Sequence, residues 1–173
     1  MRTPSMFLLL AALAVPSFGA GEHRLGLGLH YWGGSVDDVV DEGVPDVSED
    51  GVGAVVSWQY VADWLVRFEV DLEIHPDGYA GSNDTTVAPS AFLLLGTGTF
   101  YAGAGVGVAV ASDFEDNVSD PYWTGRVGID LHPGPRIHVD IHADYRVDAF
   151  ADLEEVELDG DLWTIGAMVR FTL

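Results

Sequence analysis

The 173-residue chain contains no cysteine and no lysine. Without cysteine, neither a disulfide framework nor a thiolate metal site is available. Seven arginines stand against 28 acidic residues, for a net charge of −21. Because nucleic-acid binding depends on clustered Lys and Arg, this composition argues against a nucleic-acid partner. No segment reaches the roughly 18 uninterrupted apolar residues that a membrane-spanning helix needs, which excludes a helical membrane protein.

Residues 1–20 have the features of a secretory signal peptide. A single cation precedes an apolar run over 6–15, and small residues follow up to Gly19 and Ala20, where we expect cleavage. The remaining residues, 21–173, are enough for one exported domain.

Eight segments of the chain alternate apolar and polar residues with the period of two that is typical of β-strands. They span residues 24–32, 52–61, 64–75, 87–95, 100–110, 122–132, 137–147 and 162–173. In the third, Val66 and Phe68 share one face, whereas Arg67 and Glu69 share the other. No charged residue falls on the apolar face of any segment. Most segments are close to the length of about 9–11 residues that a tilted membrane strand needs.

The connections between these segments alternate between long and short. The long ones are 33–51, 76–86, 112–121 and 148–160, and tight turns lie between them. This alternation predicts an up-and-down barrel with one tight rim and one elaborated rim.

Aromatic residues on the apolar face are sorted to two heights of the predicted barrel. Trp58, Tyr60, Trp64, Phe100 and Phe171 fall at the tight-turn end, and Tyr31, Trp123, Tyr145 and Trp163 at the long-loop end. Two aromatic rings that bound an aliphatic band are typical of the interfaces of membrane barrels. We therefore expect the apolar face to point outward, into lipid.

The alternating terminal strand from Trp163 to Leu173 and these aromatic rings resemble the OmpA/OmpX-type eight-stranded outer-membrane β-barrels. The resemblance covers all of 21–173. It implies an all-β, eight-stranded antiparallel up-and-down transmembrane β-barrel in the bacterial outer membrane. It also implies a monomer, contact with outer-membrane lipid and lipopolysaccharide, and insertion by the barrel assembly machinery.

The opposite, polar face would then line the lumen of the barrel. Its predicted polar network consists of Arg67, Glu69, Asp71, Glu73, Arg126, Asp130, His138, Asp140, His142, Asp144, Arg146 and Arg170. An eight-stranded barrel is only wide enough for its side chains to fill, and buried charges need partners. We therefore expect a plugged, salt-bridged lumen rather than an open porin.

The pairing register of two hairpins determines which inward-facing residues lie opposite one another in the lumen. In the hairpin between the fourth and fifth segments, a turn that pairs Leu95 with Phe100 places Phe92 opposite Gly103. In the hairpin between the sixth and seventh segments, Asp130 lies opposite His138 in one register, and Arg126 lies opposite Asp144 in another. The pattern does not distinguish these two registers.

Metal binding and catalysis are the alternatives to a plugged, salt-bridged lumen. His132 and His138, with Asp130 and Asp140, offer nitrogen and oxygen ligands for a zinc-like ion. Histidines satisfied by hydrogen bonds are the favoured interpretation, because a metal site needs three converging ligands. Ser57 has no nucleophile motif around it, so we expect no catalytic residues and no enzyme activity.

The long connections are strongly acidic and contain no arginine. Asp37, Asp38, Asp41 and Glu42 are candidates for weak Ca²⁺ or Mg²⁺ binding that bridges the rim to lipopolysaccharide phosphates. No other cofactor or metal is expected.

The sequence thus predicts a small outer-membrane barrel with a structural or surface-interaction role. One alternative is a soluble periplasmic or secreted eight-stranded barrel that binds a small apolar ligand, as lipocalins do. A second alternative is a lipid A-modifying outer-membrane enzyme.

Overall fold

The structure is a computed structural model that describes residues 21–34, 50–62, 65–76, 84–111, 118–119, 121–148 and 162–173. The predicted signal peptide and the candidate cation ligands Asp37, Asp38, Asp41 and Glu42 lie outside these residues. Within the described ranges, no helix has the length and hydropathy of a membrane span.

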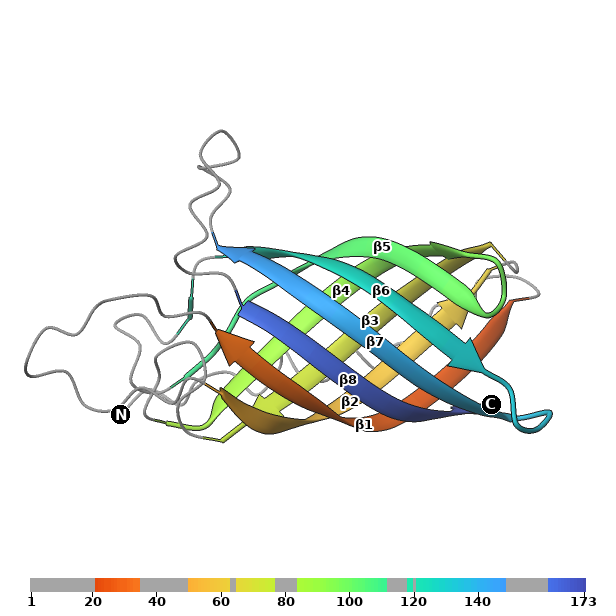
Figure 1. The fold of residues 1–173 in the computed structure, drawn as a ribbon, viewed down its shortest axis with the longest axis horizontal. Helices are drawn as coiled ribbons and strands as arrows, with labels where there is room; N and C mark the ends of the chain where they lie inside the picture. Colours follow the sequence, from red (N-terminus) through yellow and green to blue (C-terminus); the bar gives the residue numbers. More distant parts are fainter. Residues whose placement is uncertain are drawn as a thin grey trace, which may run out of the picture.

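Eight antiparallel strands close into a barrel in which each strand pairs with its neighbours in sequence and β1 pairs with β8 (Figure 1). The strands are β1 (Glu22–Gly34), β2 (Asp50–Val61), β3 (Val66–His75), β4 (Thr86–Gly96), β5 (Phe100–Gly107), β6 (Tyr122–Leu131), β7 (Ile137–Asp148) and β8 (Leu162–Thr172). The predicted eight-stranded up-and-down barrel is confirmed. The fifth strand ends earlier than predicted, and Val110 instead forms isolated bridges with Val87 and Val118.

The two ends of the barrel differ in their connections. Short connections, 62–65, 97–99 and 132–136, join strands at one end, which we call the tight-turn end. The 132–136 turn and the C-terminus lie at this end, on the right of Figure 1. The strand ends that border 35–49 and 149–161 lie at the opposite end, which we call the loop end.

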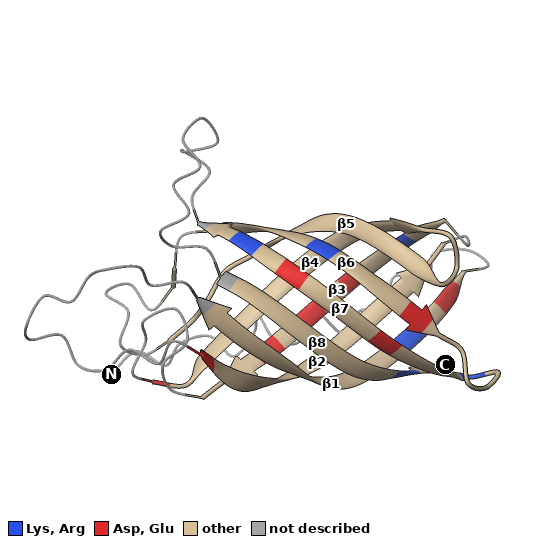
Figure 2. Ribbon diagram, in the orientation of Figure 1, with Lys and Arg blue, Asp and Glu red and all other residues tan. Residues whose placement is uncertain are grey.

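The barrel turns its apolar face outward. Leu27 is 65% exposed and Val127 is 59% exposed, whereas Arg126 is 1% exposed and Asp140 is fully buried. Charged positions recur along the length of the wall (Figure 2), yet among the described strand residues only Asp50 combines a charge with outward parity. Asp50 begins β2 at the loop end, where it accepts a hydrogen bond from the Tyr31 hydroxyl at 2.5 Å. This arrangement is the reverse of a soluble barrel with an apolar cavity.

Inward-facing glycines make room for bulky inward side chains on the neighbouring strand. Gly105 lies opposite Phe92, and a Cβ on Gly105 would meet the Phe92 ring at 2.5 Å. In the same way Gly128 lies opposite Tyr101, whose ring fills the space above it. The lumen is therefore packed by pairing large residues with empty positions.

The observed registers of the β4–β5 and β6–β7 hairpins can be compared with the registers considered from the sequence. The prediction that Phe92 lies opposite Gly103 was wrong by two residues, because Gly96 pairs with Tyr101 and the turn is confined to 97–99. In the β6–β7 hairpin, Arg126 lies opposite Asp144, which is the second of the two registers considered.

The outward aromatic residues lie near the ends of their strands. Tyr31, Phe100, Trp123, Tyr145, Trp163 and Phe171 are exposed, and Trp58 is half-buried. Tyr60 was expected to be exposed at the membrane interface, but it is 7% exposed because it packs beside His23, with ring centroids 5.0 Å apart. Trp64 lies outside the described residues.

Candidate functional site in the barrel lumen

The polar residues predicted to face the lumen come mainly from β3, β6 and β7. All twelve of them are buried: Arg67, Glu69, Asp71, Glu73, Arg126, Asp130, His138, Asp140, His142, Asp144, Arg146 and Arg170. Strict alternation along each strand places every second side chain inside the barrel. The closed sheet then brings residues from distant strands within hydrogen-bonding distance across the bore.

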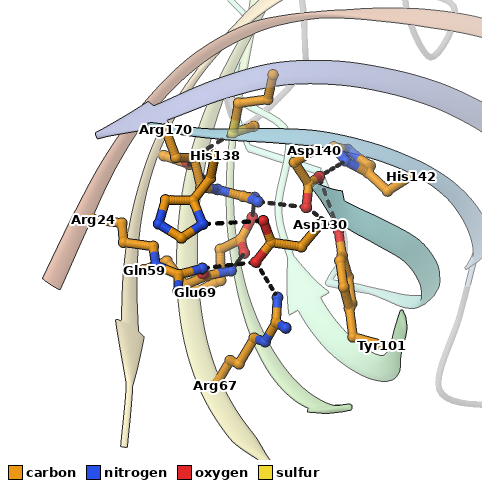
Figure 3. Close-up of polar contacts among 12 residues, drawn as sticks. Arg24, Gln59, Arg67, Glu69, Tyr101, Asp130, His138, Asp140, His142 and Arg170 are labelled. Atoms are coloured by element: carbon orange, nitrogen blue, oxygen red, sulfur yellow. Dashed lines mark hydrogen bonds and ion pairs between the residues drawn. The ribbon is translucent and has the colours of Figure 1, made fainter. Parts of the chain in front are cut away.

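Asp130 is the centre of the contacts at the tight-turn end (Figure 3). Its Oδ2 accepts hydrogen bonds from Arg24 Nη1 at 2.7 Å and from Arg67 Nη1 at 2.9 Å. Its Oδ1 lies 3.2 Å from His138 Nδ1. Arg24 also donates to Glu22 at 2.6 Å. One carboxylate therefore holds three side chains from three different strands.

Arg126 occupies the middle of the lumen and contacts three carboxylates. It forms a bidentate pair with Asp144 at 2.7 and 2.8 Å, and its Nη1 donates to Glu69 at 2.7 Å and to Asp71 at 2.8 Å. Its guanidinium also lies over the Phe92 ring, 3.8 Å from the centroid. Bidentate, charge-assisted bonds of this kind are the strong and directional ones in proteins.

Arg170 joins the middle of the lumen to Asp140. It forms ion pairs with Glu69 and with Asp140 Oδ2, the latter at 2.6 Å. Asp140 also accepts a hydrogen bond from the Tyr101 hydroxyl at 2.8 Å and lies 2.6 Å from His142 Nδ1 (Figure 3).

From His142 the contacts continue toward the loop end. His142 Nε2 lies 2.9 Å from His30 Nε2, and His30 Nδ1 lies 3.2 Å from Glu73. Glu73 in turn accepts two hydrogen bonds from Arg146 at 2.8 Å and lies 3.0 Å from His75.

These contacts form one connected network along the bore. Its members are Glu22, Arg24, His30, Gln59, Arg67, Glu69, Asp71, Glu73, His75, Tyr101, Arg126, Asp130, His138, Asp140, His142, Asp144, Arg146 and Arg170, hereafter the lumen network. The two ends are linked because Arg24 donates to Gln59 at 3.2 Å and Gln59 donates to Glu69 at 2.6 Å. Chemically, the network holds its carboxylates in contact with arginine or histidine side chains. Among these residues, no row of carboxylates without such contacts runs along the bore.

The lumen network also includes residues that the sequence prediction did not select. Tyr101 is one of them: its inward parity in β5 is visible in the sequence, but an aromatic residue between small ones does not by itself indicate a hydrogen bond to a lumen carboxylate. Ser57 was considered as a nucleophile, but the hydrogen bonds that its hydroxyl makes are to Met168 Sδ at 2.9 Å and from Arg170 Nε at 3.4 Å. Neither partner is a general base, so these contacts do not form a nucleophilic relay.

Comparisons with known proteins rest on structure alone, since no family model and no curated protein sequence matches the chain. Neisserial surface protein A superposes with a TM-score of 0.54 at 15% identity, over 90% of this chain and 98% of that one. The outer membrane protein OprG from Pseudomonas aeruginosa superposes with a TM-score of 0.50 at 12% identity, over 88% of this chain and 93% of that one.

The fold and its outward apolar surface define the class: the chain has the fold of the eight-stranded outer-membrane β-barrels of the OmpA/OmpX-like type. The predicted fold class is confirmed. The predicted location in a bacterial outer membrane agrees with the fold that the chain shares with these two structures and with the exposed apolar residues on the outward face of the barrel.

Proposed function

We propose that the chain is a small outer-membrane barrel with a structural or surface-interaction role and a lumen that does not conduct. The observation that carries the proposal is the lumen network, whose charged groups are paired with one another across the bore. The membrane-spanning part would serve as a rigid anchor, and the connections at the loop end would contact the surroundings.

Ion passage through this lumen would require the network to break. Arg126 and Arg170 lie across the bore between Glu69, Asp140 and Asp144, and each is fully buried. Removing one partner from a buried pair leaves an uncompensated charge, at a cost of about 3–5 kcal/mol. A path for hydrated ions would have to separate several such pairs at once, which supports a closed lumen.

Proton transfer along the network would also be interrupted. A relay needs groups that alternately bind and release a proton. The link from Glu69 to Asp140 runs through Arg170, and a guanidinium does not release its proton in proteins. We therefore infer that the network serves stability rather than transport.

The same reasoning extends to activity and partners. We infer that the chain is not an enzyme, because the contacts of Ser57 lack a base and the lumen carboxylates are held by arginines. Its partners would be outer-membrane lipid and lipopolysaccharide around the apolar band, and the barrel assembly machinery during insertion. The apolar face of a single barrel is covered by lipid, so a monomer is expected.

Conductance across a planar lipid bilayer tests the proposal. The refolded barrel is expected to give no stepwise current in potassium chloride, whereas a 16-stranded porin inserted in the same way gives clear steps. A gel that compares boiled and unboiled samples would verify that the inserted protein is folded. Reproducible current steps from the folded barrel would contradict the closed lumen.

A further inference from the structure

Three side chains with metal-binding atoms converge at the tight-turn end of the barrel. Asp130 lies near the end of β6, His132 begins the turn that follows, and His138 lies near the start of β7. One ligand atom from each lies within 4.8 Å of the others. Because the β6–β7 hairpin is short and Asp130 is held by Arg24 and Arg67, the three positions are fixed relative to one another.

The spacing of these atoms fits a tetrahedral metal site. His138 Nδ1 lies 3.2 Å from Asp130 Oδ1, and His132 Nε2 lies 3.7 Å from Asp130 Oδ2. In a tetrahedral zinc site with bonds of about 2.0–2.1 Å, neighbouring ligand atoms are about 3.3–3.4 Å apart. The two distances end on different oxygens of one carboxylate, and the ligand atoms of the three residues lie within 4.8 Å of one another, so binding of one ion would draw the exposed His132 side chain closer to Asp130 and His138.

The second nitrogen of His138 is held as it is in known metal sites. His138 Nε2 lies 3.3 Å from Glu22 Oε1 and 3.2 Å from Thr172 Oγ1. A metal-binding histidine usually donates its other N–H to such a carboxylate, which fixes the ring and its tautomer. With the proton on Nε2, the lone pair of Nδ1 faces the Asp130 carboxylate, and a cation between the two removes their repulsion.

Access and charge define the kind of ion. The His132 side chain is 43% exposed, so an ion can reach the buried Asp130 from solvent at this end. Arg24 and Arg67 oppose a bound cation, while Glu22 and Asp130 offset them. Two imidazoles with one carboxylate suit zinc, nickel or copper ions, whereas calcium and magnesium prefer sites made of oxygen ligands alone.

We propose that Asp130, His132 and His138 bind a divalent transition-metal ion of the zinc type, with water or an external ligand at the fourth position. The site is independent of whether the lumen conducts. Its position at the end of the barrel, beside the exposed side chains of His132 and Glu22, gives it an opening to the aqueous phase.

Isothermal titration of the refolded, untagged barrel in detergent micelles with zinc chloride tests the proposal. One saturable site per chain is expected at pH 7.5, and His132→Ala is expected to weaken binding at least tenfold. His132 is a suitable variant because its exposed ring contributes no short hydrogen bond, so the barrel should still fold. A boiled-versus-unboiled gel would verify folding of each protein.

His23→Ala is the matched control, because His23 also lies at the tight-turn end but packs against Trp58 and Tyr60 instead of Asp130. This variant should bind zinc as the original chain does, and any heat with calcium chloride should be the same in the original chain and in both variants. Absence of a saturable zinc site, or equal affinity in His132→Ala and His23→Ala, would overturn the proposal.

Discussion

Replacement of Arg126 with methionine is expected to lower the free energy of unfolding by about 3–5 kcal/mol. The guanidinium contacts Glu69, Asp71 and Asp144, and all four side chains are buried. Methionine keeps much of the volume but leaves these carboxylates without their shared cation. A urea titration of the barrel in lipid vesicles, followed by tryptophan fluorescence, measures the effect.

The matched control is Arg136→Met, since Arg136 lies exposed in the turn between β6 and β7. This change is expected to alter the free energy of unfolding by less than about 0.5 kcal/mol. The double variant Arg126→Met/Asp144→Asn should recover part of the loss, because it removes one of the stranded charges. Equal stability of Arg126→Met and Arg136→Met would mean that Arg126 does not hold the lumen network together.

A charge on the outward face is expected to have the second-largest effect. Leu27 lies in the middle of β1, and its side chain is 65% exposed. If this surface is covered by acyl chains, Leu27→Arg places a cation near the bilayer midplane, at a cost of about 2–4 kcal/mol. The same urea titration in vesicles measures the difference.

Leu131→Arg provides the comparison, since Leu131 is also outward-facing but is the last residue of β6 at the tight-turn end. An arginine near the interface reaches the headgroups and is expected to cost only about 0–1 kcal/mol. If both variants cost the same, or if Leu27→Arg is neutral, the outward face is not in contact with the hydrocarbon of a bilayer.

The barrel and its inside-out character could be predicted because alternation fixes the face on which each side chain lies. In β3, the even-numbered positions from Val66 to Ile74 are apolar and the odd-numbered positions from Arg67 to His75 are polar. A helix would mix these two sets around its circumference. The alternating lengths of the connections then specified strand order. The pattern alone left the direction of the apolar face open, and the two heights of the aromatic residues were needed to decide it.

Pairing register was harder to predict for a physical reason. A slip of two residues leaves every side chain on its original face, so parity cannot detect it. In the β4–β5 hairpin, Phe92 pairs with Gly105, but the sequence pattern allows Gly103 equally well, because either glycine leaves space for the ring. The turn decides, because Gly98 adopts a positive φ of 77° and confines the connection to 97–99.

The ion-pair partners within the lumen also could not be predicted from the sequence. Parity identifies which side chains point inward, but pairing across the bore depends on the stagger of strands around the closed barrel. Arg170 from β8 meets Glu69 from β3, although these strands are not neighbours. The meeting of Asp130 with Arg24 and Arg67 depends on the same stagger.

The direction in which the two faces point can be tested directly because the chain has no cysteine of its own. Val56→Cys and Ala91→Cys face outward, whereas the neighbouring Ser57→Cys and Ser90→Cys face inward and are close to isosteric with serine. In vesicles, fluorophores on the two outward cysteines are expected to be quenched by a quencher carried on lipid chains. The two inward cysteines are expected to resist a water-soluble thiol reagent until the barrel is unfolded. Rapid reaction of the Ser57→Cys and Ser90→Cys barrels with that reagent, together with no lipid quenching at positions 56 and 91, would contradict a charged lumen inside a lipid-facing apolar wall.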